Sequence, residues 1–112
     1  MKVISADKIR DALSELCIRA NLVLRKDVLS GLKSAYSREV KRRAKDILQA
    51  IINNAYIAQK EKLAICQDTG LPVIFLEIGQ ELKINGGLRR AINKGVEEGY
   101  RIGCLRNSII SN

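Results

Sequence analysis

The sequence predicts a helix-rich α/β fold with a few short, mostly buried strands. Four stretches of the chain carry apolar residues three and four positions apart, which is the spacing of an amphipathic helix. One continuous apolar run follows the single proline and is typical of a buried strand. With 112 residues, 46% of them apolar and 4% aromatic, the chain is one domain or a fragment of one with an aliphatic core.

The first two predicted helices span residues 6–20 and 26–36. Ser5 is a good N-cap for the first helix, and Cys17 lies on its apolar stripe. We therefore expect Cys17 to be a buried, inert residue and not a ligand. Gly31 slightly weakens the second helix.

The third predicted helix spans residues 38–60, with Ser37 as its N-cap. Its first turns carry a basic cluster, made up of Arg38, Lys41, Arg42, Arg43 and Lys45. A nucleic-acid site would add aromatic residues for base stacking or a groove-entering motif, and neither occurs nearby. We expect a solvated helix face here, and nucleic acid is not an expected partner.

The second half of the chain predicts a buried strand over 72–78 and a fourth helix over 88–100. Asn85-Gly86-Gly87 separates the two elements and indicates a turn. Gly95 and Gly99 lie one turn apart on the fourth helix, which predicts that another helix packs closely against it. The sequence shows neither a linker nor an internal repeat, so we expect residues 1–112 to be a single domain or fragment.

Charge and residue usage exclude several function classes. A net charge of +8 is compatible with an acidic partner, a small polyanionic substrate or nucleic acid. No segment approaches the roughly 20 apolar residues of a membrane helix, and the first residues do not resemble a signal peptide, so we expect a cytoplasmic protein. Three widely spaced cysteines fit neither a disulfide framework nor a paired zinc motif. The absence of histidine excludes a self-contained cysteine–histidine enzyme.

The segment Cys66-Gln67-Asp68-Thr69-Gly70 carries more chemistry than a turn requires. A turn uses the glycine and the aspartate, but it has no use for an exposed thiol. An iron–sulfur cluster suits Cys66, because cluster thiolates can come from distant segments or from another polypeptide. Asp68 would then serve proton transfer or orientation, and Gln67 would hydrogen-bond a substrate carboxylate. Asp68 taken alone fits a turn-capping role equally well.

Two further segments follow the loop and its apolar strand: Ala91-Ile92-Asn93-Lys94-Gly95-Val96-Glu97-Glu98-Gly99-Tyr100 and Leu105-Arg106-Asn107-Ser108. In this order, the loop, the strand and the two segments resemble the N-terminal part of class I (iron–sulfur) fumarate hydratases. They are equally similar to the related L-tartrate dehydratase alpha subunit. The resemblance implies an oxygen-sensitive 4Fe-4S hydro-lyase. It implies that Cys66 is one of three cluster ligands, that Gln67, Asp68 and Arg106 line the dicarboxylate site, and that Asp68 is catalytic.

Several departures from the family pattern limit what this chain can do. Neither Cys17 nor Cys104 matches the other two cluster cysteines, and Cys104 stands where a bulky aromatic residue is common, so we expect it to be a packing residue. The family's alpha region is longer than this chain and is completed by a beta domain or subunit. We therefore expect the remaining alpha segment and the beta part as partners in a homo- or hetero-oligomer, and no activity from this chain alone.

The resulting hypothesis is a part of a hydro-lyase that reversibly hydrates a dicarboxylic acid, with fumarate to L-malate, a step of the tricarboxylic acid cycle, as the first candidate. One alternative is the alpha part of an L-tartrate dehydratase. The other is a non-catalytic binding module that uses the basic helix face.

Overall fold

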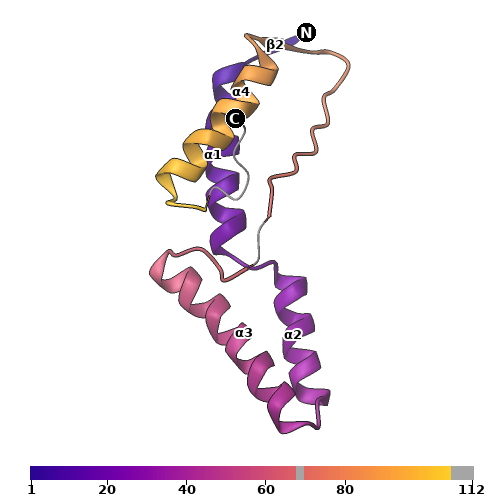
Figure 1. Cartoon of the computed structure of the whole chain (residues 1–112). Coiled ribbons are helices and arrows are strands. Elements are labelled where there is room, and N and C mark those ends of the chain that lie inside the picture. Colours follow the sequence, from indigo (N-terminus) through magenta and orange to yellow (C-terminus); the bar gives the residue numbers. More distant parts are fainter. Residues whose placement is uncertain (68–69, 107–112) are drawn as a thin grey trace. The chain divides into compact units, whose positions relative to one another are not determined.

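The computed structural model describes residues 1–67 and 70–106. Within these residues, four helices and two strands follow one another as β1 (Lys2–Ser5), α1 (Ala6–Leu22), α2 (Lys26–Arg38), α3 (Arg42–Glu61), β2 (Leu82–Asn85) and α4 (Leu88–Ile102) (Figure 1). The helix-rich α/β class is thus confirmed. No helix among the described residues is long and apolar enough to cross a membrane. The contacts divide the chain into two compact units, residues 20–67 and residues 1–19 with 68–112.

The unit formed by the two ends of the chain contains two strand–helix pairs. Strands β1 and β2 are parallel, with Lys2 opposite Leu82 and Ser5 opposite Asn85. Strand β1 leads directly into α1, whereas Gly86 and Gly87 separate β2 from α4. Ser5 caps α1 as predicted, because its Oγ accepts a hydrogen bond of 3.2 Å from the amide of Asp7. The predicted turn at 85–87 is present, and Gly86 has a φ of 109°, a conformation that favours glycine.

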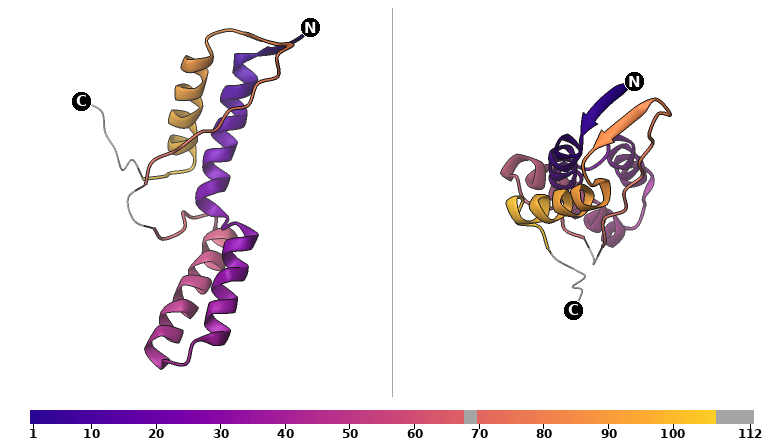
Figure 2. Two further views of the ribbon diagram at one scale, coloured as in Figure 1. Left: turned by 90° about the vertical axis from the view of Figure 1, so that its right-hand side faces the viewer. Right: turned by 90° about the horizontal axis from the view of Figure 1, so that it is seen from above.

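Helix α4 packs closely against α1, as the two glycines predicted (Figure 2). A Cβ atom added at Gly95 would lie 2.6 Å from the carbonyl oxygen of Arg10, and one at Gly99 would lie 2.8 Å from that of Ser14. Cys17 is buried at this contact, which confirms its predicted packing role. Burial raises the pKa of the Cys17 thiol and keeps it in its unreactive, protonated form.

The unit spanning residues 20–67 contains the helical hairpin of α2 and α3 (Figures 1 and 2). Its core is small and comes from one side of α3, where Ile52, Ala55 and Ala58 are buried. Helix α2 has no buried residue. Two cation–π contacts join the helices: the Lys33 and Lys45 ammonium groups lie 5.2 and 4.8 Å from the ring centres of Tyr56 and Tyr36.

The predicted start of the third helix is wrong. Ser37 does not cap α3 but lies inside α2, where its Oγ donates a hydrogen bond to the carbonyl oxygen of Lys33. Glu39 ends α2, and its carboxylate accepts hydrogen bonds from the amides of Val40 and Lys41. A carboxylate that bonds the two following amides offers the backbone an alternative to the helix, so α3 begins only at Arg42.

The predicted buried strand over 72–78 is also not formed. Residues 71–78 have no assigned strand, and the side chains of Val73 and Phe75 are 65% and 93% exposed. The strands that do form are four residues long and mostly exposed. A buried strand requires covering layers on both faces, and the described residues place none over this segment.

Candidate functional site

The predicted site residues fall in both units of the chain. Cys66 and Gln67 end the unit of residues 20–67, whereas Arg106 belongs to the other unit. Asp68, the predicted catalytic residue, lies outside the described residues, as do Thr69, Asn107 and Ser108 of the motifs. The geometry of each described group can therefore be given within its own unit.

The segment that carries Cys66 begins at a tight reversal at the end of α3. Lys62 adopts the left-handed conformation, with φ 54° and ψ 45°, and its amide donates to the carbonyl oxygen of Ala58. The amide of Leu63 donates to the same oxygen at 3.0 Å. These bonds satisfy part of the helix end and direct the chain away from the α3 axis.

Two asparagines then hold the segment in place. The amide of Ile65 donates to the backbone carbonyl of Asn21 at 2.8 Å. The amide of Cys66 donates to the Oδ1 atom of Asn54 at 2.9 Å. A backbone N–H can bond only to an acceptor, so the Asn54 carbonyl oxygen must face the segment. The backbone of Cys66 is therefore attached to the middle of α3.

The side chain of Gln67 also has a protein partner. Its Nε2 atom donates to the Oδ1 atom of Asn21 at 3.0 Å, and Asn21 lies in the last turn of α1. A carboxamide has two N–H donors and an oxygen with two lone pairs, so one bond to Asn21 does not use up its capacity. The bond orients the Gln67 side chain, and its predicted contact with a substrate carboxylate stays a prediction.

Cys66 fits the role of one ligand and not of a complete metal site. Its residue is exposed, so the thiol is accessible to an external group. The described residues contain no group of three His, Cys, Asp or Glu side chains that could hold a metal ion. The predicted role of Cys66 as one ligand of a shared cluster stays a prediction.

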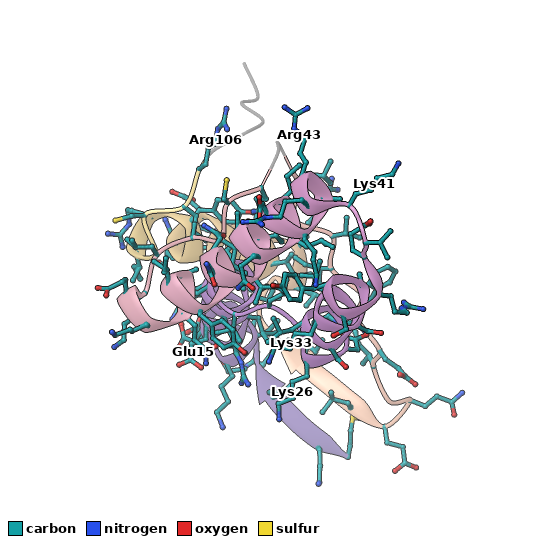
Figure 3. All side chains as sticks on the ribbon, turned by 90° about the horizontal axis from the view of Figure 1, so that it is seen from below. Glu15, Lys26, Lys33, Lys41, Arg43 and Arg106 are labelled. Carbon is teal, nitrogen blue, oxygen red and sulfur yellow. The ribbon has the colours of Figure 1, made fainter. Side chains whose placement is uncertain are left out.

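Arg106 follows a short, well-anchored turn at the end of α4. The amide of Leu105 donates to the carbonyl oxygen of Tyr100 at 2.9 Å, and the Leu105 side chain is buried. Arg106, the next residue, is exposed, and its side chain projects outward from the segment after α4 (Figure 3). A guanidinium on a fixed turn can offer a planar pair of donors to a carboxylate.

Cys104 does not have its predicted packing role. The residue is exposed and has a positive φ of 52°. Leu105, and not Cys104, provides the buried contact that closes the α4 end. Cys104 thus supplies the left-handed residue of this turn, and its exposed side chain is not part of the packed interior.

The basic helix face has a local explanation within the α2–α3 hairpin. Lys41 and Arg43 extend outward into solvent (Figure 3), and Arg42 lies 3.7 Å from the carboxylate of Asp46. Tyr36 lies at this face, and the Lys45 ammonium is 4.8 Å from the centre of its ring. Lys41, Arg42 and Arg43 are exposed, as expected for a solvated helix face.

Asn21 and Asn54 are the residues that sequence reasoning missed. Asn54 precedes the buried Ala55 and lies one turn before the buried Ala58, so it borders the apolar stripe of α3. A polar residue at the border of a packed helix face is a signal that its side chain has a specific partner. The partner, a backbone amide twelve residues later, could not be identified from the pattern alone.

Comparison with known proteins places these residues in a family. A model of the fumarate hydratase family, Fumerase, matches residues 10–112. A provisionally assigned L(+)-tartrate dehydratase subunit alpha of Methanocaldococcus jannaschii is 37% identical over 97 residues, which cover 81% of this chain and 34% of that protein. A provisionally assigned class I fumarate hydratase of Geobacillus stearothermophilus is 28% identical over 97 residues, covering 83% of this chain and 19% of that protein.

The chain thus spans about a third of the length of the first relative and about a fifth of the second. The family match includes the loop that carries Cys66 and Gln67, the glycine-bearing helix α4 and the turn before Arg106. These are the segments on which the resemblance rested. The chain belongs to the family of class I fumarate hydratases and their tartrate dehydratase relatives.

Proposed function

We propose that this chain is part of an iron–sulfur-dependent hydro-lyase that reversibly hydrates a dicarboxylic acid, with fumarate to L-malate as the first candidate reaction. The family match over residues 10–112, a range that includes Cys66, Gln67 and Arg106, carries this proposal. The three residues supply a thiol, a carboxamide and a guanidinium, which suit a cluster ligand and a dicarboxylate site. On this proposal the chain is inactive alone.

Cys66 would hold one iron of a 4Fe-4S cluster. Its exposed side chain and its anchored backbone support this role, since a ligand shared with other segments has to be accessible and fixed. The remaining ligands would come from outside this chain. When bound, a cluster with one iron that lacks a protein ligand supplies a Lewis acid for a substrate oxygen.

The substrate would be held and oriented by this chain's polar residues. The guanidinium of Arg106 would clamp one carboxylate through two parallel hydrogen bonds. Gln67, oriented by Asn21, would donate to a substrate oxygen. Asp68 follows Gln67 directly and would move a proton or orient the reacting group.

The proposal also includes partners, because the chain spans only part of the length of its relatives. The relative from Methanocaldococcus jannaschii is named as a subunit alpha. We infer that this chain acts with the remaining alpha segment and a beta domain or subunit, in a homo- or hetero-oligomer in the cytoplasm. Copurification of the chain with tagged versions of these parts tests the assembly.

The activity is tested by anaerobic co-expression of the chain with the remaining alpha and beta parts of the family. We expect the purified complex to convert fumarate to L-malate, and we expect Cys66→Ser to abolish the conversion. Cys104→Ser is the matched control, because Cys104 is also exposed but is not expected to bind the cluster. Normal activity of the Cys66→Ser complex would contradict the proposal.

L-tartrate is the second candidate substrate. The relative named as a tartrate dehydratase shares more identity with this chain than the one named as a fumarate hydratase, 37% against 28%. The same complex should therefore be assayed for dehydration of L-tartrate. A higher kcat/KM for L-tartrate than for fumarate and L-malate would replace the first candidate with the second.

A further inference from the structure

Two asparagine side chains connect the proposed site residues to the helices of the same unit. Asn54, in α3, accepts from the amide of Cys66 at 2.9 Å. Asn21, in the last turn of α1, accepts from the carboxamide of Gln67 at 3.0 Å. Neither asparagine is part of the motifs that carry the family resemblance.

Asparagine at position 54 contributes little to the stability of helix α3. Asparagine is a poorer helix former than alanine, and the neighbouring Ala55 and Ala58 are buried. An alanine at 54 would support the helix better, but it would leave the Cys66 amide without its acceptor. The contact with Cys66 is the feature of the structure that accounts for an amide side chain at this position.

We propose that Asn54 and Asn21 are positioning residues: Asn54 fixes the backbone of the cluster ligand Cys66, and Asn21 fixes the carboxamide of Gln67 toward the substrate. This inference rests on the proposed function. A ligand that is already ordered loses less conformational freedom when it binds its cluster, so binding is tighter. The two asparagines divide the task, because one holds the residue that binds iron and the other holds the residue that binds substrate.

The first experiment uses the 112-residue chain by itself and measures hydrogen–deuterium exchange at the amide of Cys66. We expect Asn54→Ala to accelerate this exchange about fivefold, the factor for loss of one ordinary hydrogen bond. Asn54→Asp should retain the protection, because it keeps an acceptor oxygen. Circular dichroism should show unchanged helix content, since alanine favours the helix.

Asn53→Ala is the matched control. Asn53 precedes Asn54 on α3, and its Oδ1 atom accepts a hydrogen bond from Gln49 of the same helix at 2.8 Å. The control removes an asparagine from α3 without touching Cys66, so exchange at the Cys66 amide should not change. Equal exchange at Cys66 in the Asn54→Ala and Asn53→Ala chains would overturn the assignment of Asn54.

The second experiment uses the complex assembled with the remaining alpha and beta parts. Asn54→Ala should lower the iron and sulfide bound per complex at least severalfold and weaken the EPR signal of the dithionite-reduced cluster. Asn21→Ala should leave the iron content unchanged and raise the KM for the dicarboxylate about threefold to tenfold. The backbone bond from Ile65 to Asn21 survives that substitution, which leaves the loop attached.

The outcomes separate this inference from the proposed function. Iron content and EPR signal equal to those of the Asn53→Ala complex would show that the Asn54 contact is only structural and would overturn the inference. An unchanged KM in the Asn21→Ala complex would overturn the assignment of Asn21. Failure of the proposed function would instead appear as full activity of the Cys66→Ser complex, whatever happens to exchange at the Cys66 amide.

Discussion

The contact between α1 and α4 makes Gly95 a sensitive position. A Cβ atom at Gly95 would lie 2.6 Å from the carbonyl oxygen of Arg10 and 3.0 Å from the Cβ atom of Leu13. Ordinary van der Waals contact begins at 3.4 Å, so Gly95→Ala requires the two backbones to separate by about 0.8 Å. The neighbouring atom is a backbone oxygen, which cannot rotate away as a side chain could.

Two opposing contributions determine how Gly95→Ala changes the free energy of unfolding. Alanine is the better helix former and stabilises a helix by about 1 kcal/mol relative to glycine. Overpacking a close contact costs about 1–3 kcal/mol. We expect Gly95→Ala to lower the free energy of unfolding by up to about 2 kcal/mol.

Gly31 provides the matched control in α2. A Cβ atom added there meets nothing within 4 Å, and the residue is exposed. Gly31→Ala should therefore raise the free energy of unfolding by about 0.5–1 kcal/mol, with the helix preference acting alone.

Urea unfolding followed by circular dichroism at 222 nm gives both values. The difference between the two substitutions isolates the packing term, for which we expect about 1–3 kcal/mol. If Gly95→Ala stabilises the chain as much as Gly31→Ala does, the close packing of α1 and α4 is refuted. Gly99 is the independent repeat of the test, because a Cβ atom there would lie 2.8 Å from the carbonyl oxygen of Ser14.

Three further predictions concern other parts of the chain. Iodoacetamide at pH 8 should alkylate Cys66 and Cys104 and spare Cys17, because the Cys17 thiol is buried and has a raised pKa. Peptide mass spectrometry identifies the alkylated cysteines, and rapid alkylation of Cys17 in the folded chain would contradict its burial. Phe75→Ser should increase the solubility of the isolated chain, measured by sedimentation after concentration, because the phenyl ring is 93% exposed; unchanged solubility would show that this ring does not drive association. Lys62→Gly should stabilise the α3 end by about 0.5–1 kcal/mol in urea unfolding, since Lys62 has a φ of 54°, and a loss of stability would argue against the left-handed cap.

Local sequence signals predicted the helices well, because their causes lie within a few residues. Ser5 caps α1 and Gly86 makes the turn before α4, as expected from their chemistry. The start of α3 was misjudged for an equally local reason. Ser37 and Glu39 both lie near the break between the two helices. The carboxylate of Glu39 determines where the break falls, because it accepts hydrogen bonds from the two following backbone amides.

Local sequence features also indicated only some of the candidate site residues. Cys66, Gln67 and Arg106 could be named as candidates because their chemistry is unusual for a turn and because the motifs resemble a family. Asn21 and Asn54 could not, because their proposed roles depend on contacts 46 and 12 residues away in sequence. Side-chain partners at such separations depend on the tertiary fold, and a short stretch of sequence does not reveal them.

The segment 72–78 has the sequence pattern of a buried strand but does not form one. Its continuous apolar run specifies a strand that is covered on both faces and paired along its edges. Among the described residues no backbone hydrogen bond joins it to another strand, and Val73 and Phe75 remain largely exposed. A strand is a property of a sheet and not of a segment.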